Sequence, residues 1–384
     1  MSSPIVILGS GLAGFGIARA LRRLNSECEI VMICADSGDS YSKPQLSTAL
    51  AAKKTAQNLV QQSSLSIAVQ LNIKIISNTE IVKIDTRKSY LYTNTCEEVH
   101  YSKLVLALGS SARKLSVKGN GKDNVLSVNS LNDYHNFQTT LQDKKEVVVI
   151  GGGLIGCEFT NDLLVAGYKV RLVEPCAALL NSLVPKQVGT KLQQVFEDEG
   201  AQVHLGRCAI EVNSSAIGLN VLLDNGEQIH ADLVLSAIGV EPNVNLAYWA
   251  GIRVNHGIVV DRYLRTSVPN IFAIGDCAEL EGRVLPYIAP ILAGSKALAS
   301  TLLGEETAVI YGPMPVLIKT TLFPLVTSPV PLGANGHWNI EIREAGIKAL
   351  FEKENGELVG MALGGDAVKE RAGLVRKLPS LMSE

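Results

Sequence analysis

The sequence predicts an α/β protein made of two similar βαβ-based domains followed by a small α+β domain. The first observation is an internal repeat, because "IVILGSGLAG" (5–14) and "VVVIGGGLIG" (147–156) share one pattern. The second is that each copy leads into a helical pattern and then into another apolar strand. The third is the alternation in "HWNIEIREAGIKALFEKENGELVGMALGG", which is typical of an antiparallel meander. A chain of 384 residues has room for these three domains.

Composition excludes several other classes of protein. The formal net charge is −2 and 19% of residues are charged, so we expect neither a nucleic-acid partner nor a membrane surface. The longest apolar runs, such as "KLVLALG", have the length of a buried strand and are too short to insert into a membrane. The N-terminal "MSSP" leads directly into a strand, so no secretory signal is expected and the cytoplasm is the predicted location. The seven cysteines form no C-x-x-C, and the six histidines have no ligand spacing, so no metal site is expected.

Each copy of the repeat ends in G-x-G-x-x-G between a strand and a helix. The first glycine permits a tight turn, the second lets the backbone approach a pyrophosphate, and the third lets the helix pack on the strand. The free N–H groups at the helix start then favour the phosphates. One such motif is weak evidence, whereas two in this context predict two dinucleotide sites. The predicted contact residues are Gly9, Gly11, Leu12, Ala13 and Gly14 in the first site, and Gly151, Gly153, Leu154, Ile155 and Gly156 in the second.

An acidic residue follows each motif at the end of the second strand. Asp36 and Glu174 lie about 20 residues beyond the last glycine, where a carboxylate accepts hydrogen bonds from ribose hydroxyls. Asp39 is an alternative to Asp36 in the same "ADSGD" stretch. Glu174 would repel the 2′-phosphate of NADP, and "EPCAAL" after it supplies no arginine, so the sequence favours NADH.

Later strands return toward each predicted site. "KLVLALGSSAR" (103–113) ends at Gly109 and "DLVLSAIGVEPN" (232–243) ends at Gly239, where a small residue lets the backbone approach a ligand. "RTSVPNIFAIGDCAE" (265–279) ends at Asp276, which could also be an ordinary turn aspartate. Two dinucleotide sites in one chain suggest one bound flavin and one passing nicotinamide, with hydride moving between them.

In combination these motifs resemble the pyridine-nucleotide-dependent flavoproteins of the disulfide-reductase superfamily, over roughly residues 4–312. The resemblance implies a glutathione-reductase-like pair of Rossmann-like domains, with FAD in the first and NAD(H) as substrate in the second. It implies that Asp276 binds a ribityl hydroxyl, that Gly109 and Arg113 also contact FAD, and that Gly239 contacts NAD. The expected domains are 1–118 with 246–312 for FAD, 119–245 for NAD, and 313–384 at the C-terminal end.

The stretch "YSKPQLST" (41–48) narrows the resemblance, because residues 37–60 contain no cysteine. Disulfide-reducing members carry a redox cysteine or cysteine pair here. The stretch is instead similar to the "Y-x-R-P-x-L-S" of ferredoxin- and rubredoxin-type reductases, with Lys43 in place of the arginine and Pro44 after it. By this resemblance Lys43 and Pro44 contact FAD. Thr48 stands where many members have a further lysine.

The tail "YGPMPVLIKTTLFPLVTSPVP" (311–331) resembles rubredoxin–NAD reductases and flavorubredoxin reductases. That resemblance implies that Lys319 faces the flavin, although a lysine closing an edge strand remains an alternative. It also implies that reduced FAD passes single electrons to rubredoxin, a small acidic iron protein, with alkane hydroxylation as the process served. The rivals are a ferredoxin reductase of an oxygenase system, an NADH oxidase, and a flavoprotein that signals through an NADH-bound conformation.

Glu158 lies two residues beyond Gly156, in the first turn of the second nucleotide helix. An acid there can simply favour the helix dipole. Because the nicotinamide must stack on the flavin near this turn, we expect Lys43 and Glu158 to face each other and hold that ring. Lys43, Glu158 and Lys319 are therefore the expected catalytic residues. The short C-terminal domain favours a monomer, and basic residues near the flavin edge would steer an acidic carrier: Arg19, Arg22, Arg23, Lys53, Lys54 and Lys296.

Overall fold

The computed structural model describes residues 3–331 and 333–382. Its first sheet is fully parallel and has the strand order β20-β9-β1-β2-β5. Continuous apolar runs form these strands because both faces of the sheet are covered. The strands are β1 (Ile5–Leu8), β2 (Ile30–Ile33), β5 (Lys74–Ile76), β9 (Lys103–Leu106) and β20 (Ile271–Ala273).

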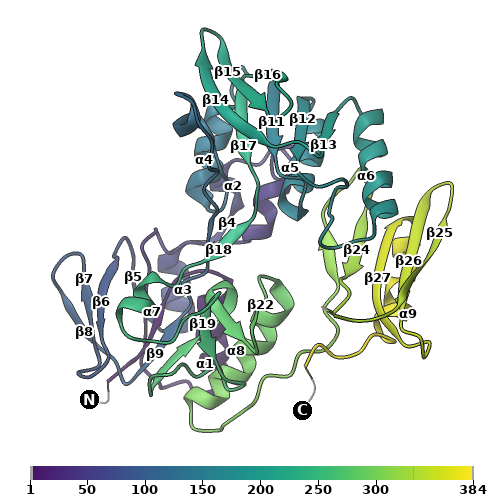
Figure 1. Cartoon of the computed structure of the whole chain (residues 1–384). Coiled ribbons are helices and arrows are strands. Elements are labelled where there is room, and N and C mark those ends of the chain that lie inside the picture. The colour runs from purple at the N-terminus through teal and green to yellow at the C-terminus, as the bar shows by residue number, and fades with distance from the viewer. Residues whose placement is uncertain (1–2, 332, 383–384) are drawn as a thin grey trace.

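Helices and small sheets complete this first unit, whose parallel sheet lies in the lower part of Figure 1, whereas α2 and β4 lie higher, beside α4. Helices α1 and α8 pack closely, since a Cβ on Gly16 would meet Ser295 Oγ at 2.6 Å. The helices are α1 (Leu12–Leu24), α2 (Ala56–Leu59), α3 (Ser64–Leu71), α7 (Asn245–Trp249) and α8 (Ile288–Leu302), with 3₁₀ turns η1 (Lys43–Thr48) and η3 (Gly275–Cys277). The small sheets are β3 (Ser40–Tyr41) with β4 (Val60–Gln62); β6 (Ile81–Asp85), β7 (Tyr90–Thr93) and β8 (Glu98–His100); and β19 (Ile258–Val260), β21 (Ala278–Leu280) and β22 (Arg283–Val284).

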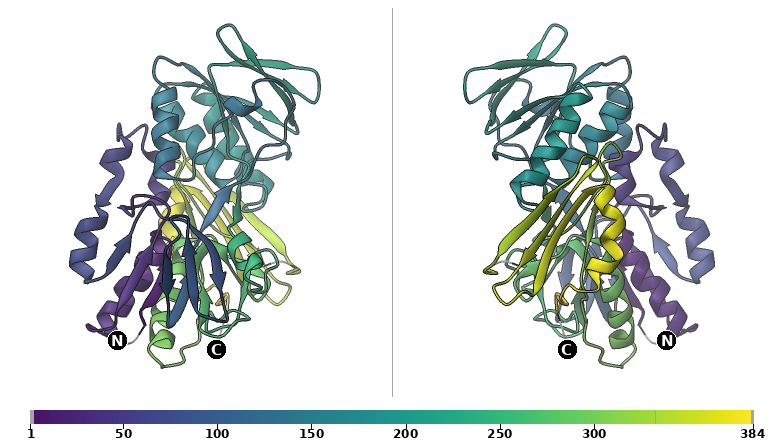
Figure 2. Two further views of the ribbon diagram at one scale, coloured as in Figure 1. Left: turned by 90° about the vertical axis from the view of Figure 1, so that its left-hand side faces the viewer. Right: turned by 90° about the vertical axis from the view of Figure 1, so that its right-hand side faces the viewer.

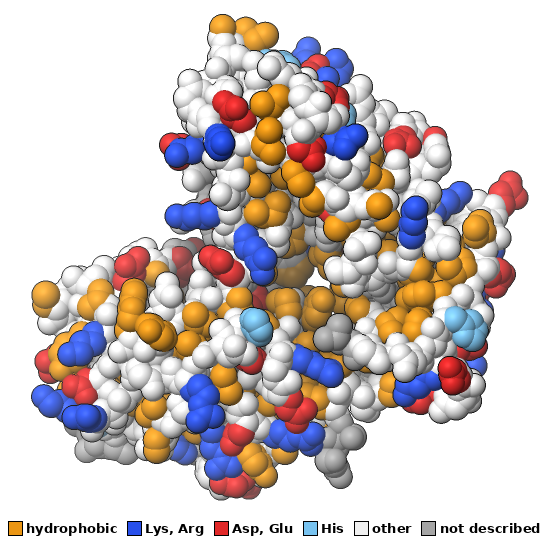
Figure 3. Space-filling view, in the orientation of Figure 1, with side chains coloured by type: hydrophobic (Ala, Val, Ile, Leu, Met, Phe, Trp, Pro, Cys, Tyr) orange, Lys and Arg blue, Asp and Glu red, His pale blue; other side chains and the backbone are white. Residues whose placement is uncertain are grey.

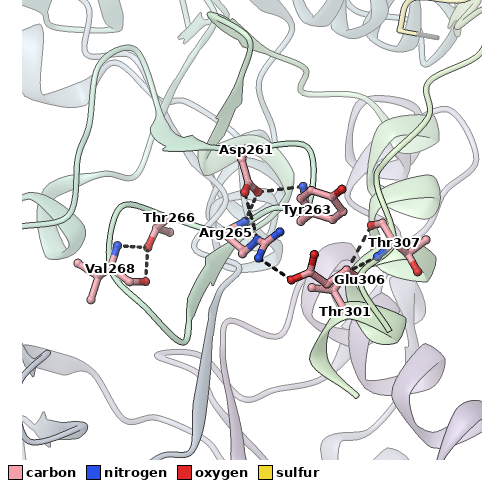
Figure 4. Close-up of polar contacts among 8 residues, drawn as sticks. All are labelled: Asp261, Tyr263, Arg265, Thr266, Val268, Thr301, Glu306 and Thr307. Atoms are coloured by element: carbon pink, nitrogen blue, oxygen red, sulfur yellow. Dashed lines mark hydrogen bonds and ion pairs between the residues drawn. The ribbon is translucent and has the colours of Figure 1, made fainter. Parts of the chain in front are cut away.

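One arginine fastens the β19–β20 region to the segment after α8. Arg265 contacts Asp261 at 3.1 Å and Glu306 at 2.9 Å, and its guanidinium lies 4.3 Å from the centre of the Tyr263 ring. Figure 4 shows Arg265 reaching from one segment to the other. Exposed ion pairs of this kind each contribute little to the free energy of unfolding, so this cluster links two surface segments and adds little to overall stability.

The second parallel sheet repeats the first and has the order β13-β12-β11-β17. An antiparallel sheet, β14-β15-β16, packs over one face of it, and a turn in "LDNGEQ" joins β15 to β16. The strands are β11 (Glu146–Ile150), β12 (Lys169–Glu174), β13 (Gln202–Leu205), β14 (Ala209–Ser215), β15 (Gly218–Leu223), β16 (Gln228–Ala231) and β17 (Leu233–Ser236). The helices are α4 (Leu131–Thr140), α5 (Leu154–Val165) and α6 (Lys186–Asp198), with the 3₁₀ turn η2 (Lys122–Asn124).

Two antiparallel strands connect these units, β10 (Ser110–Ala112) and β18 (Val240–Pro242). Asn243 ties the connection to the first unit, because its amide nitrogen donates to the Leu108 carbonyl at 2.8 Å. The two βαβ units and the fold class therefore follow the sequence pattern. The residue boundaries expected for the domains remain a prediction.

The C-terminal part is a five-stranded antiparallel sheet with the order β23-β24-β27-β26-β25. The predicted three-strand meander is present, and two further strands extend it. Figure 2 shows this yellow sheet lying across the junction of the other two units. The strands are β23 (Val316–Ile318), β24 (Leu325–Ser328), β25 (His337–Ile342), β26 (Gly346–Glu352) and β27 (Leu358–Gly365).

The last part of the chain returns to the first unit. After β27 the chain forms a 3₁₀ turn, η4 (Asp366–Glu370), followed by the short α9 (Arg371–Val375). Beyond it, Met382 pairs with Tyr311, with backbone bonds of 2.9 and 3.2 Å in the two directions. Met382 is buried in the core of the first unit. Within the described ranges, no helix is both long and apolar enough to cross a membrane.

Candidate active site

The first glycine motif forms the turn between β1 and α1. A Cβ on Gly14 would collide with the Gly9 carbonyl oxygen, so the third glycine permits the close packing of helix and turn. Gly11 is the N-cap of α1, and no protein atom lies within 4 Å of the place where its Cβ would be. The turn therefore leaves open space in front of unpaired helical N–H groups, which fits a diphosphate.

The second motif has the same geometry between β11 and α5. Gly156 packs against the carbonyl of Gly151, and Gly153, the N-cap of α5, again faces open space. The structure thus brings both predicted sets of glycines to helix N-termini at the carboxyl ends of parallel strands. Open α/β sheets bind their ligands at this edge.

The acids after the second strands lie beside these turns. Asp36 accepts hydrogen bonds from the Ser10 hydroxyl at 2.8 Å and from the Gly38 N–H at 3.0 Å, and Ser10 belongs to the glycine turn. Asp39 instead accepts from the N–H of Ser64, so the geometry favours Asp36 as the ribose-binding acid. Glu174 is buried and accepts from two backbone N–H groups, those of Gly152 and Cys176.

The returning strands end as the motifs predict. Gly109 and Gly239 have φ of +65° and +102°, a left-handed conformation that favours glycine, and both face open space. Asp276 accepts a hydrogen bond from the Ser110 hydroxyl at 2.8 Å, which fixes one of its carboxylate oxygens. Arg113 is exposed on the connection between the units, where its side chain donates to the Val240 carbonyl at 3.3 Å.

The best-defined charged contact joins three distant parts of the chain. Glu158, on α5, is 1% exposed, and its Oε2 lies 2.6 Å from Lys319 Nζ. Its Oε1 accepts the backbone N–H of Lys319 at 2.9 Å, and its Oε2 also accepts the Ser47 hydroxyl at 2.5 Å. Lys319 Nζ further donates to the Pro44 carbonyl at 2.6 Å and to Ser47 Oγ at 3.1 Å. All three N–H donors of this ammonium thus have an acceptor.

The structure confirms that Lys319 lies at the end of an edge strand, and its place beside the flavin stays a prediction. It directly follows β23, the edge strand of the C-terminal sheet, and its side chain reaches α5 and η1. The pairing expected between Lys43 and Glu158 is corrected, because Lys319 holds the position beside Glu158. The tertiary packing of the C-terminal sheet brings Lys319 beside Glu158. The spacing of residues along the chain does not reveal this packing.

Lys43 lies at the start of η1 and is half-buried. In the part of the chain that the structure describes, its ammonium has neither an ion-pair partner nor a hydrogen-bond partner. Burial lowers the pKa of Lys43, and the charges of Asp276 and Asp133 act in the opposite direction. The charge of Asp276, the predicted ribityl-binding residue, is thus one of the two that favour the charged form of Lys43.

Two more polar residues of α5 were not predicted as site residues. Asn161 accepts the Leu322 N–H at 3.0 Å and donates to the Thr321 hydroxyl at 3.0 Å. Asp162 accepts the N–H groups of Leu50 and Ala51 at 2.9 and 3.0 Å. The signal in the sequence is the spacing 158, 161, 162 in "LIGCEFTNDLLV", which places three polar groups on one face of an otherwise apolar helix.

The cysteines near the site are buried or lie away from η1. The described residues hold free cysteines only, and none lies in η1. Cys157 and Cys277 are buried on elements of different units; burial raises the pKa of Cys157 and raises that of Cys277 to about 11. Both thiols are therefore protonated and unreactive at neutral pH.

A hollow lies where the three parts of the molecule meet. Figure 3 shows hydrophobic side chains gathered on its walls and Lys and Arg side chains near its mouth. Apolar walls with a few placed polar groups are typical of cofactor sites.

These features define a class of two-dinucleotide flavoproteins, and comparison with known proteins agrees. Residues 3–296 match the profile of the pyridine nucleotide-disulphide oxidoreductases, and the chain belongs to this family. Residues 308–378 match a rubredoxin-binding C-terminal domain.

The similar proteins cover the whole chain. It is 44% identical to a rubredoxin–NAD(+) reductase of Alcanivorax borkumensis, over 99% of both chains. It is 38% identical to a nitric oxide reductase FlRd–NAD(+) reductase of Aliivibrio fischeri, over 98% of this chain and 99% of the relative. Among solved structures, a ferredoxin reductase from Rhodopseudomonas palustris has a TM-score of 0.89 at 28% identity, covering 99% of this chain and 96% of that one. These matches confirm the family resemblance seen in the sequence.

Proposed function

We propose that this chain is an NADH-dependent flavoprotein reductase that delivers single electrons to rubredoxin. The observation that carries the proposal is the Lys319–Glu158 pair, in which a lysine of the rubredoxin-binding type of domain meets an acid of the predicted NAD helix. Relatives named rubredoxin–NAD(+) reductase, at 44% and 41% identity over nearly the full chain, support it.

The residues present fit two dinucleotides. The first glycine turn, Asp36, Gly109 and Asp276 would hold FAD, with Lys43 and Pro44 of η1 at its reactive end. The second glycine turn, Glu174 and Gly239 would hold NADH. When bound, NADH supplies a hydride and the flavin converts that two-electron donor into a one-electron donor.

Residues of this chain would orient the two rings and keep the charge between them balanced. Glu158 and Lys319 form a pair without net charge, so they can stand at an apolar contact between rings without repelling either partner. The two helix N-termini fix the ligand diphosphates and thereby set the distance between donor and acceptor atoms. Hydride transfer needs no general base, and the site offers no histidine for one.

Electrons would leave toward a docked protein because η1 supplies no thiol. The lack of disulfides, with thiols kept free, suits the cytoplasm, where we place the reaction. Alkane hydroxylation is the process we propose that it serves, with the chain acting as a monomer.

The test is stopped-flow oxidation of NADH by the FAD-loaded protein, with rubredoxin, a plant-type ferredoxin and oxygen as acceptors. We expect rubredoxin to be reduced fastest. Fast reduction of ferredoxin or oxygen with none of rubredoxin would contradict the proposal. A ferredoxin result would instead support the ferredoxin-reductase alternative, for which the similar Rhodopseudomonas palustris structure speaks.

A further inference from the structure

Asp162 is a buried carboxylate that is stabilised by a loop of another unit. It is 2% exposed, and each of its oxygens accepts one backbone N–H, from Leu50 and from Ala51. These two residues follow η1 almost directly, and α5 and η1 lie against each other. A carboxylate buried in this way requires donors for both oxygens, and the loop supplies them.

The segment that carries Leu50 and Ala51 begins with η1, and η1 supplies two of the three acceptors for the Lys319 ammonium. Pro44 offers its carbonyl and Ser47 its hydroxyl, both from η1, while Glu158 supplies the third acceptor. Glu158 and Asp162 are one helical turn apart on α5. Helix α5 therefore holds η1 near its end, where Glu158 bonds Ser47, and just beyond its end, where Asp162 bonds Leu50 and Ala51.

The far end of the segment has a separate attachment. The Lys54 carbonyl accepts hydrogen bonds from the Tyr134 hydroxyl at 2.9 Å and from the Gln138 amide at 3.1 Å. Lys53 is exposed between the two attachments, and Lys54 is exposed at the far one. If Asp162 were replaced, the segment up to Lys53 would be held at one end only, by the Lys54 carbonyl.

An amide cannot replace this carboxylate. In asparagine one acceptor becomes an NH₂ group, which would point at a backbone N–H of Leu50 or Ala51 and leave that donor unpaired in a buried place. η1 would then shift relative to α5, and Lys319 would lose alignment with two of its three partners.

We propose that Asp162 is a positioning residue for the reduction of the flavin: it holds η1 in place and thereby completes the set of partners around Lys319. The proposal rests on the proposed function, since the step that it tunes is flavin reduction by NADH. Asp162 acts through Ser47, Pro44 and Lys319 and need not touch either dinucleotide.

The experiment compares Asp162→Asn with Asp232→Asn. Asp232 is the control because it also accepts two neighbouring backbone N–H groups, those of Lys145 and Glu146, at 2.8 and 2.9 Å, but both on one oxygen, which an asparagine keeps. Stopped-flow spectroscopy of each FAD-loaded variant gives the rate constant of flavin reduction at saturating NADH and the Kd for NADH. Limited trypsin digestion of each protein without added NADH measures cleavage after Lys53 and Lys54.

We expect Asp162→Asn to lower the rate constant about 10-fold, the size expected for a sub-ångström misplacement, with little change in Kd. Trypsin should cut the segment faster. Asp232→Asn should leave the rate constant, the Kd and the cleavage as in the unaltered protein. In a Lys319→Met background, Asp162→Asn should lower the rate constant no further, because Asp162 acts through the alignment of the Lys319 ammonium, which this background lacks.

Three results would overturn the proposal: an unchanged rate constant in Asp162→Asn, an equal loss in Asp232→Asn, or the full additional loss in the Lys319→Met background. If Asp162→Asn fails to fold, Asp162→Glu decides, since it keeps the charge and displaces the loop by one methylene; a normal rate constant there also refutes the proposal. If the unaltered protein does not reduce its flavin with NADH, the proposed function fails. The trypsin comparison would still show whether Asp162 holds the segment.

Discussion

Lys319 Nζ lies 2.6 Å from Glu158 Oε2, although 161 residues separate the two along the chain. The pair joins the C-terminal sheet to the first helix of the second βαβ unit, and Ser47 brings in the first unit. Three separate folding units thus complete one small cluster.

Removing the lysine should destabilise the protein because it leaves Glu158 buried beside no ammonium. We predict that Lys319→Met lowers the free energy of unfolding by about 2–3 kcal/mol, and that adding Glu158→Gln restores part of the loss. Denaturant titration measures both. Lys348→Met is the control: its ion pair with Glu370 is also 2.6 Å long but more exposed, and should contribute under about 1 kcal/mol. Equal losses in the two variants would refute this account.

Lys43 should behave in the opposite way, because its half-buried ammonium has no partner among the described residues and its pKa is lowered by burial. We predict that Lys43→Met leaves the unfolding free energy of the FAD-free protein unchanged or raises it, while flavin reduction by NADH slows. Lys43→Arg should retain reduction better. A loss of more than about 1 kcal/mol in the FAD-free Lys43→Met protein would instead indicate an ion pair.

Asp162 should make stability depend on pH. Burial is the main cause that raises its pKa from 3.8 to about 6. The folded protein then binds a proton more tightly than the unfolded chain does, so stability falls as pH rises from about 4 to about 6. Relative to Asp162→Asn, the unaltered protein should lose up to about 3 kcal/mol of unfolding free energy across this window. Unfolding curves at pH 4.5, 6 and 7.5 test this, and a pH-independent difference would contradict it.

The thiols should stay outside the electron path. We predict that native protein, with or without NADH, exposes the same number of thiols to an alkylating reagent. Cys96 and Cys208 are exposed and should react first, whereas the buried Cys157 and Cys277 should react only on unfolding. Mass spectrometry of the alkylated peptides locates the modified residues. Appearance of one further reactive thiol pair after NADH addition would show a disulfide path.

The first glycine turn offers a test that separates fold from cofactor. Gly14→Ala places a methyl against the Gly9 carbonyl and should destabilise the FAD-free protein, whereas Gly11→Ala faces open space. We predict that Gly11→Ala keeps the unfolding midpoint of the FAD-free protein and binds FAD far more weakly, since the methyl fills the diphosphate position. Fluorescence titration with FAD measures the affinity. Normal FAD binding in Gly11→Ala would place the diphosphate elsewhere.

Much of the fold could be predicted because it follows from local patterns. The strand–glycine–helix units depend on residues close in sequence, and so does the β25–β27 meander. An edge strand ending at Lys319 was only one of two alternatives, and β24 was missed, since "VLIKTTLFPLV" is short and interrupted by proline and threonine. The pairing of β24 with β27 joins distant parts of the chain and cannot be predicted from this segment alone.

The site also has features that follow from local sequence and features that depend on long-range packing. The two glycine turns and the acids after them are local, and the structure places them as expected. The partner of Glu158 is set by how the C-terminal sheet packs on α5, so the sequence pattern led to Lys43 where the structure has Lys319. The spacing of polar residues on α5 marks Asp162, but its partners are backbone N–H groups, which the sequence does not reveal.

The pairing of Tyr311 with Met382 has a consequence for how such proteins can diversify. The segments that lead into and out of the C-terminal sheet pair with each other at Tyr311 and Met382, so the chain enters and leaves the sheet at one place. A related sheet could be grafted there without rerouting the chain. The graft would need to preserve the Tyr311–Met382 pairing and the short loop that carries Lys319, while its outer surface could be matched to a different electron carrier.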